Sequence, residues 1–280
     1  MPAQPAPTWV LPPDLVRARC REFLRAELAA SGRSSLVVGL SGGIDSAVAA
    51  ALAVEALGPG RVCGFMLPYA TSSSASVVDA QAVAACLGLP LERVDITPMA
   101  DAFLGDVPSA ELVRRGNVMA RCRMIVLYDR SAAHDALVLG TGNRTEGLLG
   151  YTTMYGDNAC GLNPLGQLYK TEVRLLAADF GLPESVRTKA PSADLWAGQS
   201  DEDELGVTYA EVDHLLHHLV DEGLGERQLA SLGFAPPLVA RIAARVRAMA
   251  FKRRLPPVAS MPGRPDPDTG PVGAGAGSAS

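Results

Sequence analysis

A short polar loop, placed between an apolar run and an alanine-rich helical stretch, carries the side chains that most clearly suggest chemistry. Its eight consecutive residues are Gly39, Leu40, Ser41, Gly42, Gly43, Ile44, Asp45 and Ser46. Glycines let a backbone approach an anion closely, and the N–H groups at the start of the following helix favour phosphate. The serines add hydroxyl donors, whereas Asp45 beside phosphates would require a hard cation such as Mg²⁺. The alternatives are a plain strand-to-helix turn and a helix N-cap at Asp45.

The composition of this loop excludes two common nucleotide-binding motifs. It lacks the Gly-Lys-Ser/Thr sequence of a Walker loop, and it lacks the GxGxxG spacing of a dinucleotide fingerprint. The sequence therefore predicts a phosphate site of another class.

Alternating apolar and helical patterns surround the loop and predict parallel βαβ units. Strands are expected at 36–40, 61–67, 91–96 and 136–140, and helices from residue 14 and at 45–57, 76–87 and 110–133. The predicted fold is therefore α/β, a doubly wound parallel sheet flanked by helices. Ligands of such sheets bind outside the carboxyl ends of the strands, so the turns after Leu40 and Leu139 are expected to form the site.

The second half of the chain is predicted to cover the site and to add helices to the fold. We expect a loop at 151–169, a helix at 171–180, an irregular stretch at 189–206, and C-terminal helices at 209–221, 226–232 and 237–252. The acidic run 201–204 is interpreted as a solvated face rather than a metal cluster. Residues 13–257 are predicted to form one domain between a flexible segment, 1–12, and a disordered tail, 258–280.

The overall composition favours a cytoplasmic globular protein with small-molecule partners. The 280 residues include 48% hydrophobic and 20% charged side chains, which suffices for a substantial core. The net charge of −5 gives no general attraction for nucleic acid. No apolar run approaches the roughly 18 residues of a membrane span, and the chain begins without signal-peptide features. Five scattered cysteines without CxxC spacing argue against a zinc site, and the four histidines receive no role.

The loop resembles the SGGxDS loop of the N-type ATP pyrophosphatases, and further motifs resemble those of the NAD synthetases in that superfamily. These motifs occupy 115–124, 140–146, 155–157, 168–173, 191–196, 199–206 and 252–254. The resemblance runs from about residue 14 to residue 257. Seven motifs in the expected order are far more specific than the loop alone.

The resemblance implies a ligase that forms a carbon–nitrogen bond. The carboxylate of deamido-NAD would attack the α-phosphorus of ATP and form an adenylate with release of pyrophosphate, and ammonia would then displace AMP to give NAD. Residues 1–35 are too few for a glutaminase domain, so free ammonia or a separate glutaminase is expected to supply nitrogen. The resemblance also implies a homodimer. The alternatives are an adenylating amidoligase with another acceptor and a non-catalytic nucleotide sensor.

The resemblance also implies roles for individual residues. Asp45 and Glu146 would hold Mg²⁺, and Lys170 would act with Asp45 in catalysis by contacting the ATP phosphates. The other positions with implied contacts are Thr141 and Ser192 for ATP, and Arg121, Met154, Gly161 and Lys252 for the dinucleotide. Bottom-up alternatives are a surface lysine at a helix start for Lys170 and simple turn formers for Thr141 and Ser192.

Three positions depart from the polar residues found in many members of the resembled family. Met154 stands in place of a lysine, Gly161 of an aspartate and Phe251 of a histidine. The ATP half of the expected site therefore matches the family better than the acceptor half does.

Overall fold

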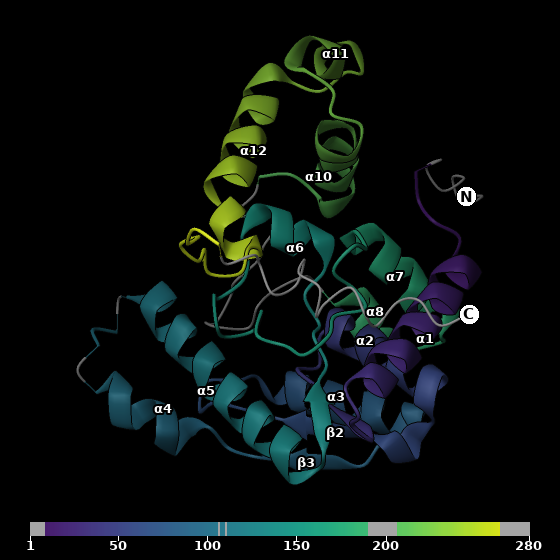
Figure 1. Cartoon of the computed structure of the whole chain (residues 1–280), viewed down its shortest axis with the longest axis vertical. Helices are drawn as coiled ribbons and strands as arrows, with labels where there is room; N and C mark the ends of the chain where they lie inside the picture. Colours follow the sequence, from purple (N-terminus) through teal and green to yellow (C-terminus); the bar gives the residue numbers. More distant parts are fainter. Residues whose placement is uncertain (1–8, 106, 110, 190–205, 264–280) are drawn as a thin grey trace.

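The computed structural model, which describes residues 9–105, 107–109, 111–189 and 206–263, contains a parallel sheet flanked by helices (Figure 1). Its strands are β1 (Ser35–Gly39), β2 (Val62–Met66), β3 (Leu91–Arg93) and β4 (Ala136–Val138). They lie in the order β3-β2-β1-β4, and every pairing is parallel. The predicted parallel α/β sheet is confirmed, although β3 and β4 end before the predicted residues 96 and 140.

Helices cover both faces of the sheet, as expected of a doubly wound fold. Leu36 and Val38 of β1 pack against α1 (Pro13–Ala30), α2 (Ile44–Leu57), α3 (Ser74–Leu87) and α7 (Lys170–Asp179). Val37 points to the other face and packs against α4 (Thr97–Leu104) and α5 (Leu112–Ala133). Because successive side chains of a strand alternate between faces, both faces of β1 are apolar and buried.

Several short helical segments were not predicted from the sequence. They are α4, α6 (Arg144–Leu149) and α8 (Glu184–Thr188), and a 3₁₀ turn, η1 (Pro59–Arg61), precedes β2. Such segments offer too few turns for an apolar periodicity to be recognised. The predicted loop at 151–169 is confirmed, with one isolated parallel bridge between Leu139 and Leu162.

The C-terminal helices share a separate hydrophobic cluster, which we call the C-terminal lobe. It comprises α10 (Tyr209–Leu216), a π-helical turn η2 (His217–Asp221), α11 (Glu226–Ser231), α12 (Pro236–Ala248) and a 3₁₀ turn η3 (Ala250–Arg253). Figure 1 shows α10, α11 and α12 gathered at one end of the molecule. Leu148 and Leu149 of α6 belong to the same cluster, so α6 joins the lobe to the sheet domain.

Residues just before α1 contact the rest of the protein. The backbone N–H of Leu11 donates to Glu172 at 3.0 Å, and the Trp9 ring lies 5.5 Å from that of Tyr169. Across the described ranges, no helix combines the length and apolar character needed to cross a bilayer.

Candidate active site

The loop after β1 is held by hydrogen bonds among its own residues. Gly43 is the N-cap of α2, and its N–H donates to Ser41 Oγ at 3.1 Å. Ser46 Oγ accepts from the N–H of Ser41 at 3.2 Å and donates to the carbonyl of Gly43 at 3.0 Å. The serine hydroxyls thus shape the turn, and the backbone N–H groups at the start of α2 remain the donors best suited to an anion.

Gly42 occupies a position that only glycine fits. Its φ is +76°, and an added Cβ would lie 2.2 Å from the carbonyl oxygen of Ser76 in α3. Lys189 reaches the same place, with Nζ 3.5 Å from the carbonyl of Gly42, 3.0 Å from Ser76 Oγ and 3.0 Å from Asp79 Oδ2. Lys189 therefore ties the loop to α3, a role that sequence reasoning missed.

Asp45 lies in the first turn of α2, and the N-cap alternative for it is wrong because Gly43 is the cap. Its Oδ1 accepts a hydrogen bond of 2.8 Å from Asn143 Nδ2, and its Oδ2 pairs with Lys170 Nζ. Asn143 lies in the turn after β4 and also caps α6 through a reciprocal capping box with Glu146. The carboxylate of Asp45 is thus directed to the turn after the neighbouring strand.

Lys170 connects the two predicted metal ligands. Its Nζ pairs with Asp45 and lies 3.4 Å from Glu146 Oε1, while its side chain is only 4% exposed. The alternative of a surface lysine is therefore wrong. The ammonium also lies 5.4 Å from the centroid of the Tyr209 ring. Burial raises the pKa of Glu146 above its usual range, and the nearby Asp45 carboxylate raises it further.

The donor set fits a hard divalent cation. Asp45 and Glu146 follow the adjacent strands β1 and β4 and are brought to one ammonium group, as expected for residues that follow two strands of one parallel sheet. Two carboxyl groups and one ammonium group meet in a partly buried place, and a divalent cation there would offset the burial and like charge that raise the pKa of Glu146. Oxygen donors of this kind suit Mg²⁺.

A buried carboxylate of the C-terminal lobe is hydrogen-bonded to residues next to Glu146 and Lys170. Asp213 of α10 accepts 2.6 Å from Thr145 Oγ1 and 2.7 Å from Thr171 Oγ1. Thr145 Oγ1 in turn accepts 3.0 Å from the N–H of Lys170. Burial raises the pKa of Asp213. Sequence reasoning missed this residue because its partners come from helices far away in the chain.

The residues predicted to hold the dinucleotide lie around the loop that follows α6. Arg121 of α5 is exposed and donates 3.1 Å to the carbonyl of Met154. Lys252 donates 2.8 Å to the carbonyl of Gly150 and 2.7 Å to that of Thr152, so it anchors the start of the same loop. Burial lowers the pKa of Lys252.

The remaining predicted residues are dispersed. Gly161 is exposed beside Leu137 and donates to the carbonyl of Val138, at the end of β4. Phe251 is 56% exposed. Thr141 is half-buried in the turn after β4, as predicted. Ser192 and the acidic run 201–204 lie outside the described residues.

Comparisons with known proteins cover most of the chain. A family model described as NAD synthase matches residues 16–256. An NH(3)-dependent NAD(+) synthetase of Trichlorobacter lovleyi is 50% identical over 250 residues, which are 89% of this chain and 92% of that protein. Its counterpart in Pelodictyon phaeoclathratiforme is 49% identical over 250 residues, which are 89% of this chain and 90% of that protein.

Solved structures are similar over the same extent. An NMN synthetase from Francisella tularensis matches with a TM-score of 0.79 and 33% identity over 90% of this chain and 100% of that one. An NH3-dependent NAD synthetase from Campylobacter jejuni subsp. jejuni matches with a TM-score of 0.76 and 34% identity over 89% of this chain and 100% of that one.

Proposed function

Because the chain belongs to the NAD synthase family and is an ATP-dependent ligase that amidates deamido-NAD, we propose that Asp45, Glu146 and Lys170 carry the ATP-dependent step. The observation that supports this assignment is the buried ammonium of Lys170, which meets carboxylates from the ends of two neighbouring strands. A purely structural ion pair would not require both carboxylates to lie at the edge of the sheet where ligands bind.

The proposed chemistry begins at the loop after β1. The N–H groups at the start of α2 bind phosphate oxygens of ATP, and Lys170 stabilises the negative charge that develops as pyrophosphate leaves. Mg²⁺, held by Asp45 and Glu146, would neutralise part of the phosphate charge. The carboxylate of deamido-NAD thereby becomes an adenylate, a good acyl donor from which ammonia displaces AMP.

We place the acceptor beside the loop that follows α6. Arg121 presents a guanidinium group suited to a phosphate or a carboxylate. Met154 and Gly161 offer their backbone and apolar surface to the acceptor, and Lys252 holds the loop in place. Ser192 and Thr141 are assigned to ATP.

We further propose a homodimer that forms through the exposed face of α5. Ile125 and Tyr128 are 53% and 41% exposed, and they follow Arg121 at helical spacings of four and seven residues. An apolar face beside Arg121 would bring the partner subunit close to the bound dinucleotide. We also propose that the protein acts in the cytoplasm and takes its nitrogen from free ammonia or from a separate glutaminase.

The test measures pyrophosphate release and NAD formation by the purified chain with ATP, Mg²⁺ and ammonia. Deamido-NAD should support both products, and glutamine in place of ammonia should support little NAD formation. Since one similar structure is described as an NMN synthetase, nicotinate mononucleotide is the alternative acceptor to compare. Preference for that acceptor would reassign the substrate. No pyrophosphate with either acceptor would favour a nucleotide sensor.

A further inference from the structure

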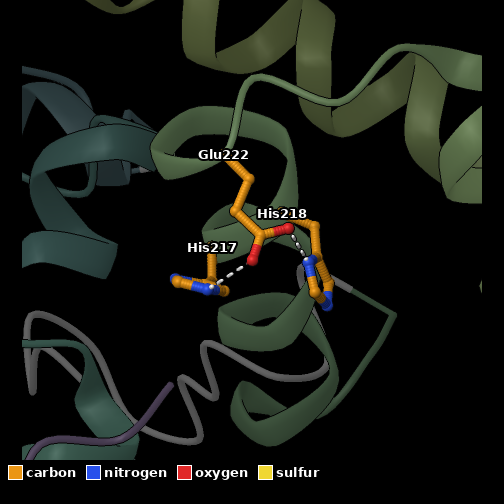
Figure 2. A group of neighbouring side chains, drawn as sticks. All are labelled: His217, His218 and Glu222. Carbon is orange, nitrogen blue, oxygen red and sulfur yellow. Dashed lines mark hydrogen bonds and ion pairs between the residues drawn. The ribbon is translucent and has the colours of Figure 1, made fainter. Parts of the chain in front are cut away.

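Three histidines and a glutamate gather in the C-terminal lobe, outside the candidate active site. His214 lies in α10, His217 and His218 begin the π-helical turn η2, and Glu222 follows it. Figure 2 shows the Glu222 carboxylate between the rings of His217 and His218, with one oxygen directed to each. Glu222 Oε1 lies 3.3 Å from His217 Nε2, and Oε2 lies 2.6 Å from His218 Nδ1.

The π-helical turn creates this arrangement. The N–H of Glu222 donates 3.1 Å to the carbonyl of His217, an i→i+5 bond that widens the turn. A regular α-helix would bring Glu222 beside His218, four residues earlier, but not also beside His217. The widened turn therefore brings both adjacent histidines to the same carboxylate, whereas a regular helix would separate one of them from it. Widened turns of this kind occur frequently at functional sites.

The second nitrogen of each ring also has a partner. His217 Nδ1 lies 3.4 Å from Asp221 Oδ2, and His218 Nε2 lies 3.0 Å from His214 Nε2. Metal-binding histidines typically use one nitrogen as the ligand and the other to bond a carboxylate or another acceptor, which fixes the ring. His217 and His218 both have this pattern, with the nitrogens nearest Glu222 left to serve as ligands.

We propose that His217 Nε2, His218 Nδ1 and a Glu222 carboxylate oxygen bind a divalent transition-metal ion such as Zn²⁺. One candidate ligand atom from each residue lies within 4.8 Å of the others. Tetrahedral zinc with bonds of about 2.0–2.1 Å needs ligand atoms roughly 3.3 Å apart, and the two distances from the Glu222 carboxylate to the rings, 3.3 and 2.6 Å, lie near that separation. The Glu222 side chain is 44% exposed, so it can rotate to direct one oxygen to the ion. Two imidazoles and one carboxylate suit zinc and its neighbours better than Mg²⁺. Solvent would supply the remaining ligand.

Aromatic rings and a hydrogen bond to the sheet domain surround the proposed metal site. The Trp9 ring stacks on His217 with centroids 5.4 Å apart, and Phe234 lies 5.2 Å from His214. These aromatic rings pack against the histidines, and apolar neighbours of a metal site reduce its contact with solvent. Asp221, which contacts His217, also accepts 2.8 Å from Tyr169 OH, so a bound metal would fix the turn against the sheet domain.

The experiment uses the full chain, freed of any purification tag and of metal, in excess Mg²⁺ to occupy oxygen-rich sites. Co²⁺ is added as the spectroscopic probe, and Zn²⁺ is added in a parallel thermal-unfolding series. We expect one equivalent of Co²⁺ to produce the visible absorption of a low-coordinate nitrogen–oxygen site, and Zn²⁺ to raise the unfolding temperature of the chain.

Matched variants separate this site from other metal-binding groups. Glu222→Gln and His218→Gln should weaken binding at least about tenfold and abolish the zinc-dependent stabilisation, since each removes a ligand. His134→Gln, at the end of α5, should bind like the unaltered chain. Absence of the Co²⁺ spectrum, or an unchanged spectrum in Glu222→Gln, would overturn the proposal and leave the cluster as a set of ion pairs.

Discussion

The amide of Asn143 donates a hydrogen bond of 2.8 Å to the carboxylate of Asp45. Asn143 lies in the turn after β4 and Asp45 in the first turn of α2 after β1, so the bond fixes the two turns relative to each other. The Asn143 side chain also accepts from the backbone N–H of Glu146 at 2.9 Å, and the backbone N–H of Asn143 donates 3.1 Å to the Glu146 carboxylate. One residue therefore orients both carboxylates of the candidate metal site.

Replacing Asn143 should separate its two contributions. Asn143→Ala removes the cap of α6 and the hydrogen bond to Asp45, and should cost about 1 kcal/mol or more of unfolding free energy together with a large loss of activity. Asn143→Ser keeps a capping hydroxyl but is too short to donate to Asp45. We expect Asn143→Ser to be nearly as stable as the unaltered chain in urea yet to have a clearly lower kcat. Equal kcat in Asn143→Ser and the unaltered chain would show that the bond to Asp45 is unimportant.

Gly42→Ala should damage the phosphate loop directly. The positive φ and the 2.2 Å approach of the new Cβ to the Ser76 carbonyl oxygen require the backbone to move, and we expect at least about 2 kcal/mol of destabilisation and weaker ATP binding. Calorimetric titration with ATP and urea unfolding measure the two effects. Gly60→Ala is the control, because no atom lies within 4 Å of its added Cβ; a similar loss in both variants would contradict the steric explanation.

The sequence predicted the parts of the site that follow from placing both strands in one parallel sheet. Asp45 and Glu146 follow apolar strands, and parallel strands bring their carboxyl ends to one edge, so their proximity could be expected before the structure was known. Strand ends were less predictable: β4 ends at Val138, and beyond it the chain pairs with the loop at Leu162, through a bridge to Leu139 and a hydrogen bond from the N–H of Gly140.

Contacts between distant segments could not be predicted. Lys189 meets Gly42 and Asp79, and Asp213 meets Thr145, only because helices far apart in the chain pack together. Nor does histidine spacing alone reveal the cluster at His217, since its convergence depends on a π-helical turn that no local periodicity predicts.

Lys189 should support ATP binding by positioning the loop. Lys189→Met removes its contacts with Gly42, Ser76 and Asp79, so we expect a higher KM for ATP and a loss of stability of about 1 kcal/mol, discounted because the lysine is 32% exposed. A double-mutant cycle with Asp79→Asn, followed by urea unfolding, checks the pairing. Additive effects of the two substitutions would rule out a coupling between them.

The exposed face of α5 should determine the oligomeric state. Ile125→Glu places a charge in the proposed dimer interface, so light scattering should report a monomer where the unaltered chain is a dimer. Val78→Glu, at a 61% exposed position on α3, is the matched control and should leave the state unchanged. A dimer that survives in Ile125→Glu would place the interface elsewhere.

The rate of pyrophosphate release by Asp45→Asn, measured with ATP, deamido-NAD, ammonia and saturating Mg²⁺, tests the assigned active site most directly. The substitution preserves the size of the side chain but removes the charge that pairs with Lys170 and would hold Mg²⁺. We predict a fall of at least about a hundredfold, with an unfolding temperature that stays within a few degrees of the original. Near-normal pyrophosphate release by a folded Asp45→Asn variant would contradict the proposal that this carboxylate carries the ATP-dependent step.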